Sequence, residues 1–279
     1  FTTYLSNPEN LNTISFDSIT AIVEDDHAIM WVGTRNGLNR FDPSTGLFDR
    51  FMRPSTDLES PLPDNRASDG SEPIETTDQE NSISSNAVNA LLIDVTGNLW
   101  IGTANGLNRY EPGKGFVQYY HDPTFSKSLS KNHVVSLYED RSGTLWVGAY
   151  AGGVNIYDRQ TDLFAYYRHD PLNPETISDN SVIPIYVDSE GYAWIGTSNG
   201  LDRFNQQTGR VVRFQNDPRN PNSLGSNDIL SITEDQGGYL WIGTTNGLDR
   251  FDRVTSTFTH FRRDTQNERS IRSNYIYVV

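Results

Sequence analysis

The chain has 279 residues, a formal net charge of −14 and no cysteine. An acidic surface repels phosphate backbones and anionic lipid heads, so we expect no nucleic-acid partner and no direct contact of this segment with a membrane. The absence of cysteine excludes disulfides and thiolate metal sites. Hydrophobic residues make up 35% of the chain, but no apolar run reaches the ~18 residues of a membrane-spanning helix.

A repeated segment organises the chain. Five tryptophans mark it, and the last three intervals between them are 46, 48 and 47 residues: Trp31, Trp100, Trp146, Trp194 and Trp241. Each period contains four short stretches rich in β-branched and aromatic residues, which in the last period read ILSITED, YLWIGT, GLDRFD and TFTHF. No window has a sustained helical spacing of apolar residues. The pattern predicts an all-β fold, a β-propeller of four-stranded antiparallel blades.

In chain order, FTTYL (1–5) matches the fourth strand of a blade, and NYIYVV (274–279) at the other end matches a first strand. We interpret both as partial blades of a longer propeller. Five blades could close a ring, but the cut ends agree equally with an open arc or an incomplete ring. In four of the complete blades, Asn-Gly joins the second strand to the third and predicts a type I′ turn. Between the partial blades lie five complete blades at about 17–51, 86–120, 132–168, 180–215 and 227–262.

One connection between blades is longer than the others. Thirteen residues separate the last aromatic residue of one blade from the Asn or Asp that opens the next, as from Tyr119 to Asn132, but 35 separate Phe51 from Asn86. The extra residues lie within 53–82, an acidic segment without aromatic residues, which we interpret as a flexible surface loop. The topology of a blade places it on the face that also carries the turns between second and third strands.

The repeated sequence mainly determines how neighbouring blades pack. A tryptophan side chain covers about 150–250 Å², and the glycine two residues later lets a neighbouring blade approach. LWIGTTNGLDRFD, preceded by SITEDQGG and followed by a fourth strand and DPRNPNSLGSND, resembles the two-component regulator propeller repeat. The resemblance recurs five times and covers almost the whole chain except the insertion.

This resemblance implies a sensory, ligand-binding propeller in the extracytoplasmic, periplasmic part of a bacterial signal-transduction receptor. Such receptors are commonly hybrid histidine kinases and sometimes cyclic-dinucleotide enzymes. They are anchored in the inner membrane, and their membrane span and output module lie outside this sequence. The segment itself is then not an enzyme and needs no cofactor, its ligand is an unidentified small molecule or glycan, and any dimer forms through the parent protein.

The sequence contains no constellation that points to catalysis or metal binding. Gly196-Thr-Ser-Asn-Gly200 matches a nucleophile pattern, but it lies in a hairpin rather than between a strand and a helix. No two of the five histidines have the spacing of a zinc site. Three acidic pairs recur at the turn between first and second strands, where Asp accepts bonds from turn amides, and we interpret them as structural: Glu24-Asp25, Glu139-Asp140 and Glu234-Asp235.

Positions at which the repeats differ are the candidates for recognition. Blade three reads WVGAYAGGVNIYD, with one extra residue and with Tyr150-Ala-Gly-Gly in place of Thr-x-Asn-Gly. Arg35 is the only charged residue at its repeat position, and His133 lies near the start of a first strand. We name Arg35, His133 and Tyr150 as ligand-binding candidates on the face with the long connections. Neutral variation of a turn explains the same differences and is the simpler interpretation.

Two further functions stay open. Some propellers that resemble this one are lyases that act through histidine and acidic residues near the axis, and His133 is the residue to test for that role. The other alternative is a scaffold for protein–protein interaction that binds partners through 53–82.

Overall fold

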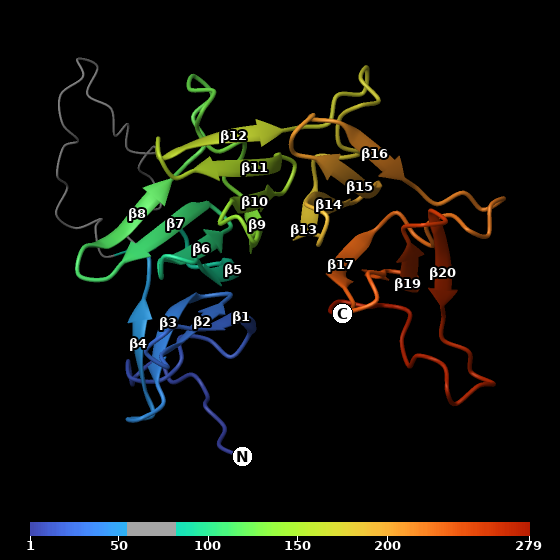
Figure 1. Cartoon of the computed structure of the whole chain (residues 1–279). Helices are drawn as coiled ribbons and strands as arrows, with labels where there is room; N and C mark the ends of the chain where they lie inside the picture. Colours follow the sequence, from blue (N-terminus) through green and yellow to red (C-terminus); the bar gives the residue numbers. More distant parts are fainter. Residues whose placement is uncertain (55–81) are drawn as a thin grey trace. The chain divides into compact units, whose positions relative to one another are not determined.

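The computed structural model describes residues 1–54 and 82–279, which fold into two compact units, Phe1–Tyr120 and His121–Val279 (Figure 1). Throughout these residues every regular element is a β-strand, and the strands form five sheets of four antiparallel strands. The prediction of an all-β fold of four-stranded blades is confirmed. Of the insertion predicted at 53–82, residues 55–81 lie outside the described residues.

The first unit contains two sheets, in each of which the strands follow one another in chain order. The first sheet comprises β1 (Ile19–Glu24), β2 (Met30–Thr34), β3 (Gly37–Asp42) and β4 (Leu47–Phe51). The second comprises β5 (Val88–Ile93), β6 (Leu99–Thr103), β7 (Gly106–Glu111) and β8 (Gly115–Tyr119).

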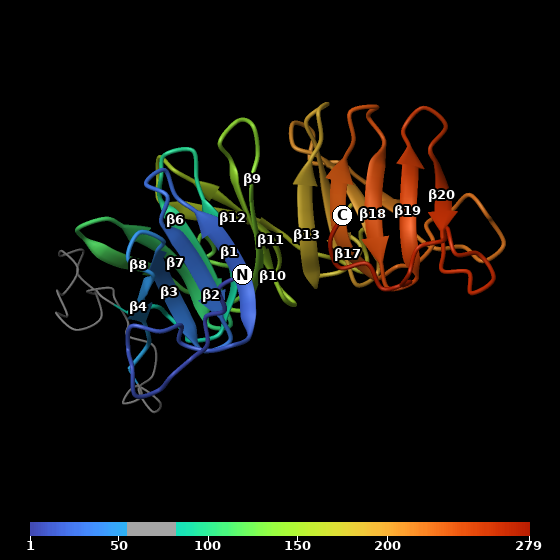
Figure 2. The ribbon, with the colours of Figure 1, turned by 90° about the horizontal axis from the view of Figure 1, so that it is seen from below.

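The second unit contains three sheets of the same order, and Figure 2 shows β17 to β20 of the last one side by side. The first comprises β9 (Val134–Glu139), β10 (Leu145–Ala149), β11 (Gly153–Asp158) and β12 (Leu163–Tyr167). The second comprises β13 (Val182–Val187), β14 (Tyr192–Thr197), β15 (Gly200–Asn205) and β16 (Val211–Phe214). The third comprises β17 (Ile229–Glu234), β18 (Leu240–Thr244), β19 (Gly247–Asp252) and β20 (Thr257–Phe261).

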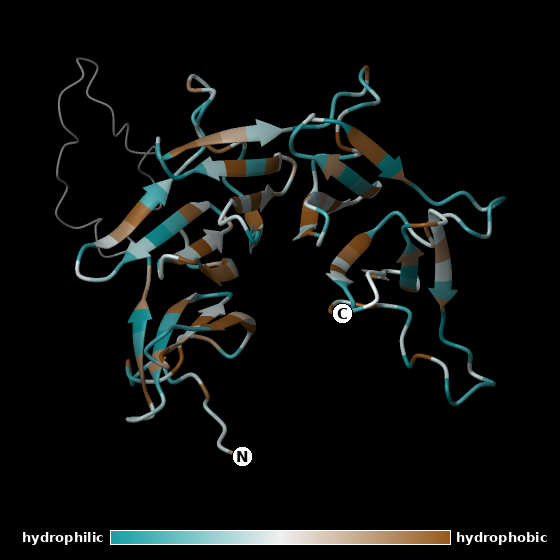
Figure 3. Ribbon diagram, in the orientation of Figure 1, coloured by the Kyte–Doolittle hydropathy of each residue, from teal (hydrophilic) through white to brown (hydrophobic). Residues whose placement is uncertain are grey.

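The second strand of each sheet is the most buried, and β6 and β10 are buried at every residue. Both faces of these strands are therefore covered, which explains why their sequences do not alternate between apolar and polar residues. Figure 3 shows the hydrophobic residues within the strands, while the connection that follows β20 is mostly hydrophilic.

Within the first unit, the two sheets pack through the tryptophan of the first. Trp31 shares a hydrophobic cluster with Val88 and Leu99, and the ring centroids of Phe51 and Phe116 are 5.4 Å apart. A Cβ atom on Gly33 would lie 2.6 Å from Cγ1 of Val88. The glycine after the tryptophan therefore allows the next sheet to approach, as the sequence predicted.

The second unit repeats this packing twice. Trp146 clusters with Val182 of the following sheet, and Trp194 clusters with Ile229 of the sheet after that. A Cβ atom on Gly196 would lie 2.6 Å from Cγ2 of Ile229. The same residue types thus make the same contact in both units.

The terminal segments lie against the end sheets of their own units without forming strands. The ring of Tyr4 packs edge-on against Phe41, with centroids 5.0 Å apart. At the other end, Ile276 N donates to Thr244 O at 3.1 Å, and Gly247 N donates to Asn274 O at 2.6 Å. The segments 1–5 and 274–279, which the sequence matched to single strands, thus contact their units without adding a strand to a sheet.

Candidate functional site

One recurring hydrogen bond stabilises the connections between sheets. Its acceptor is the side chain that opens the next blade, and its donor is the main-chain N–H eleven residues earlier, as for Asn132 Oδ1 and His121 N at 2.6 Å. This bond explains the 13-residue spacing in the sequence. It recurs at Ser6–Asp17, His169–Asn180, Asn216–Asn227 and Arg263–Asn274. Arg53 N donates to Asn86 Oδ1 in the same way across the longer connection, in which 33 residues separate the two.

A second recurring bond, present in both units, joins connections of this kind to a turn between second and third strands. Gly153 N donates to Asn180 O at 2.8 Å, and Gly200 N donates to Asn227 O at 2.9 Å. In the first unit, Gly37 N donates to Asn86 O at 2.6 Å. Within each unit the turns and the long connections therefore share one face, as the topology predicted.

In four of the sheets a threonine closes the turn on this face. Thr197 Oγ1 donates to Gly200 O at 3.0 Å and accepts from Asn199 N at 3.0 Å. It also lies 2.8 Å from Ser178 Oγ, which is part of the incoming connection. Equivalent threonines make the same two turn bonds in the other three sheets: Thr34, Thr103 and Thr244.

The sheet β9–β12 lacks this arrangement. Ala149 occupies the threonine position, and three residues rather than two connect it to Gly153, its partner in the ladder. Ala151 has a positive φ of 55°, a conformation that is uncommon for a residue with a side chain. The hydroxyl of Ser130, the equivalent of Ser178, is buried without a hydrogen-bond partner. This turn has therefore lost the polar contacts that close the others.

The same turn presents an aromatic pair to solvent. Tyr150 is 56% exposed, and its ring lies 5.5 Å from the ring of His133, centroid to centroid. The main chain fixes the pair, because Tyr150 N donates to His133 O at 2.8 Å. The structure thus brings two of the three candidate residues together. Arg35 is exposed on the equivalent turn of the first unit and is not part of this pair.

Two other histidines stabilise connections. His121 Nδ1 lies 2.7 Å from Leu129 O, and His169 Nδ1 lies 2.8 Å from Ile177 O. The side chain of Asn216 makes the same contact in the next connection. These two histidines therefore have a structural role in the connections.

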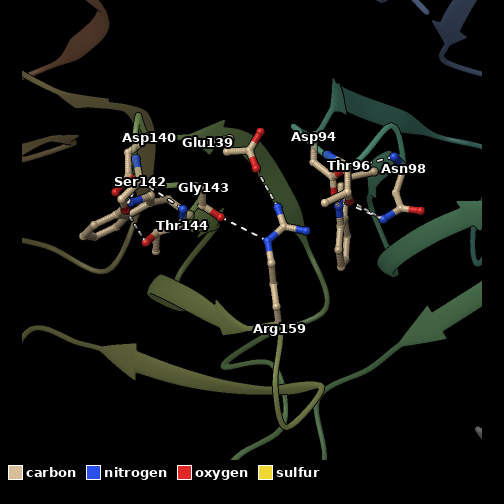
Figure 4. A network of polar contacts seen from close by, with 11 residues as sticks. Asp94, Thr96, Asn98, Glu139, Asp140, Ser142, Gly143, Thr144 and Arg159 are labelled. Carbon is tan, nitrogen blue, oxygen red and sulfur yellow. Dashed lines mark hydrogen bonds and ion pairs between the residues drawn. The ribbon is translucent and has the colours of Figure 1, made fainter. Parts of the chain in front are cut away.

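The acidic turns between first and second strands are structural, as predicted. Asp140 Oδ1 accepts from Ser142 N at 2.9 Å and from Thr144 N at 3.0 Å, while Oδ2 accepts from Trp146 Nε1 at 3.1 Å (Figure 4). Burial opposes ionisation of Asp140, but hydrogen bonds from the Ser142 hydroxyl, from Trp146 and from the two turn amides outweigh it and hold its pKa below the ordinary value. The turn at Asp94 is built in the same way.

Sequence reasoning missed two partly buried arginines that follow third strands. Arg253 Nη2 lies 3.0 Å from Glu234 Oε1 and 3.2 Å from Asp188 Oδ2, so it links two neighbouring sheets. Arg159 bonds Glu139 at 2.6 Å and Gly143 O at 3.1 Å (Figure 4). A signal was available, since Asp-Arg ends the third strand in both of these blades.

A groove of about 760 Å³ lies on the loop face of the first unit, between the 6–16 segment and β4. Phe16, Asn36 and Arg50 are among the residues that line it. The guanidinium of Arg50 is held by main-chain carbonyls, including Asn10 O at 3.0 Å. The groove is therefore supported by a structural arginine.

In the part of the chain that the structure describes, no three His, Asp or Glu side chains are grouped so that they could hold a metal ion. The same residues contain no helix that could cross a membrane.

Four segments of the chain match the sequence model of a family described as two component regulator propeller. The matched residues are 82–105, 128–151, 176–199 and 223–246. Each match covers the end of the incoming connection, the first two strands and residues of the turn after them. No curated protein has a significant match to this chain.

Several solved structures share the fold. A chain described as the extracellular domain of a hybrid two component system from B. thetaiotaomicron matches at 24% identity, with a TM-score of 0.71 over 95% of this chain and 33% of that chain. PorZ, a surface component of the type-IX secretion system of Porphyromonas gingivalis, matches at 20% identity and a TM-score of 0.61, over 93% of this chain and 35% of PorZ. The present chain therefore spans about a third of the length of either protein.

A third solved structure is described as an auxiliary nutrient binding protein from Bacteroides ovatus. It matches at 10% identity and a TM-score of 0.52, over 99% of this chain and 68% of that chain.

Proposed function

The chain belongs to the two component regulator propeller family, and from this membership we propose that it is a non-catalytic sensory segment of a bacterial signal-transduction receptor. Its place in such a receptor is outside the cytoplasm. The fold that it shares with the extracellular domain from B. thetaiotaomicron supports this proposal. The acidic net charge of −14 is consistent with a segment that recognises neither nucleic acid nor an anionic membrane surface.

Recognition takes place at the turn between β10 and β11. The observation that carries this assignment is the combination of an exposed Tyr150 on this turn with an unpartnered hydroxyl at Ser130, in the incoming connection beside it. A buried polar group without a partner costs about 1–3 kcal/mol. A surface turn that is less stable than it could be is typical of a position that serves binding.

The aromatic pair suits a ligand with both an apolar face and polar edges. The rings of Tyr150 and His133 offer flat apolar surfaces, and the phenol and imidazole offer hydrogen-bonding groups. A small molecule or a glycan has this character. Arg35 stays a separate candidate on the turn of the first unit.

The lyase alternative gains no support from the described residues, in which no carboxylate is paired with His133. A lyase of the kind considered needs acidic and basic groups that converge on one spot. The scaffold alternative depends on 53–82 and stays a prediction.

A thermal-shift screen of the chain against oligosaccharides and small metabolites tests the proposed function. Each compound that stabilises the wild type is then titrated against Tyr150→Ala and His133→Ala. We expect affinity to fall at least tenfold, about 1.4 kcal/mol. Tyr166→Ala is the matched control, because Tyr166 is an exposed tyrosine of the same sheet that lies on β12. Equal binding by all three variants overturns the assignment.

A further inference from the structure

All five sheets bury a polar side chain at the same position of the third strand, and all five residues are fully buried: Asn39, Asn108, Asn155, Asp202 and Asp249. The asparagines show what the position requires. Asn39 Oδ1 accepts from Ser15 N at 2.7 Å, and Asn39 Nδ2 donates to Val32 O at 3.1 Å. The side chain at this position therefore needs one atom that accepts a hydrogen bond and a second atom that donates one to a main-chain carbonyl.

The same donor contact recurs in the other two asparagine blades. Asn108 Nδ2 donates to Ile101 O at 3.2 Å, and Asn155 Nδ2 donates to Val147 O at 3.1 Å. An ionised carboxylate cannot make this bond, because both of its oxygens only accept. Each aspartate therefore needs either a proton or a nearby cation.

Asp249 has cations. Its Oδ1 lies 2.7 Å from His260 Nδ1 and 3.3 Å from Arg262 Nη1, while Oδ2 accepts from Gly225 N at 2.6 Å. Gly225 stands where the other blades have serine, and a side chain there would collide with Arg262. In blade five, the glycine at the serine position thus leaves room for Arg262, the counter-ion of Asp249.

Asp202 has no such arrangement. Its Oδ2 accepts from Ser178 N at 2.7 Å and lies 2.9 Å from Ser178 Oγ. Its Oδ1 is buried without a hydrogen-bond partner. The opposite residue on β14 is Ile195, which stands to Asp202 as Val32 stands to Asn39.

Two charged or titratable side chains act on Asp202 from the elements packed against it, Arg213 on β16 and His169 in the incoming connection. Both are engaged elsewhere. The guanidinium of Arg213 donates to Thr176 O at 2.8 Å and to Ile177 O at 3.2 Å. His169 Nδ1 contacts the same Ile177 O at 2.8 Å. Neither bonds to Asp202.

We propose that Asp202 is a proton-binding site, at which the neutral carboxyl group donates from Oδ1 to the carbonyl of Ile195 and takes the place of an asparagine. Loss of this proton as the pH rises towards neutrality leaves a buried charge beneath the 168–181 connection and loosens the loop face of blade four. The site is a pH-sensitive device built into one blade, and it goes beyond the recognition proposed for blade three.

The direction of the pKa shift of Asp202 agrees with this geometry. Burial raises the pKa of Asp202 from 3.8 to about 6, against the opposing effect of the Ser178 hydrogen bonds. Because the folded value lies above the unfolded one, the proton-linked stabilisation is complete below the unfolded pKa and is lost as the pH rises through the folded pKa.

The test compares urea unfolding midpoints of the wild type and Asp202→Asn at about pH 5 and about pH 8, on either side of the folded pKa. We expect Asp202→Asn to raise the midpoint at the higher pH, and the difference to shrink at the lower pH. Asp249→Asn is the matched control and is expected to lower the midpoint, because it removes the partner of Arg262. A lower midpoint for Asp202→Asn at the higher pH overturns the proposal.

A second measurement does not depend on the variant folding. Carbon-13 NMR of the wild type, labelled at the aspartate carboxyl carbons, is expected to show one buried resonance that titrates well above the ordinary aspartate pKa of about 3.9. Titration of every aspartate resonance at or below that ordinary value contradicts a protonated Asp202.

Discussion

Trp194 Nε1 donates a 2.7 Å hydrogen bond to Asp188 Oδ2, six residues earlier in the chain. The other oxygen of Asp188 accepts from the main-chain N–H groups of Glu190 and Tyr192. One carboxylate therefore satisfies a buried indole N–H and closes the turn that leads into the tryptophan strand. The indole bond recurs in the other four sheets, at Asp25–Trp31, Asp94–Trp100, Asp140–Trp146 and Asp235–Trp241.

Removal of one of these carboxylates is expected to destabilise its whole unit. Asp140→Ala leaves the indole of Trp146 and the amides of Ser142 and Thr144 without their acceptor. We expect the free energy of unfolding to fall by about 3 kcal/mol. Urea unfolding followed by tryptophan fluorescence measures this change. Glu175→Ala, at an exposed position, is the control and is expected to stay within about 0.5 kcal/mol of wild type.

The same carboxylates predict loss of stability in acid. The pKa of Asp140 is below its ordinary 3.8, because hydrogen bonds from Ser142, Trp146 and Thr144 outweigh burial. A group with a lowered folded pKa contributes stability above its unfolded pKa and loses it as the pH falls through the folded value. We therefore expect the stability difference between wild type and Asp140→Asn to narrow in acid below 3.8. A difference that stays constant across this range in urea titrations contradicts the assignment.

The arginine that links two sheets gives a third prediction. The side chains of Asp188 and Glu234, which Arg253 contacts, are only 1% and 6% exposed. Arg253→Met leaves both charges buried without a cation, and we expect a loss of about 3–5 kcal/mol. Arg219→Met is the control, since Arg219 is 92% exposed in its pair with Asp217, and such pairs contribute about 0–1 kcal/mol. Equal effects of the two changes would refute the role given to Arg253.

The sequence predicted the sheets because their determinants are local. The tryptophan interval follows from one packing position per blade, and the 13-residue connection follows from bonds such as His121 N to Asn132 Oδ1. The positive-φ glycines of the turns, Gly200 at 125° among them, follow from the Asn-Gly pairs. The structural role of the acidic turns could be predicted for the same reason, because each Asp bonds to amides of its own turn.

Contacts that depend on distant residues could not be predicted in the same way. GLDRF is identical in blades four and five, yet Asp202 and Asp249 differ because Gly225 and Arg262 come from elsewhere in the chain. Arg253 reaches Asp188 in the neighbouring sheet. These relationships arise only when the blades are packed.

The candidate site could be predicted from the sequence only in part. The sequence singled out His133 and Tyr150 separately, and their ring contact follows from the main-chain bond between them. The unpartnered hydroxyl of Ser130 was not recognised. Its signal was visible, because Ala149 interrupts the threonine that the other four turns share.

Replacement of the turn between β10 and β11 tests the central claim most directly. In the variant, Ala149–Gly153 is exchanged for the Thr-Thr-Asn-Gly of 244–247, which removes Tyr150 and restores a threonine beside Ser130. Thermal unfolding is measured with and without each stabilising compound from the screen. We expect the unliganded variant to gain about 1 kcal/mol from the restored hydrogen bonds and to lose the ligand-induced shift. A shift of wild-type size in the variant, or a screen in which no compound stabilises the wild type, contradicts the account.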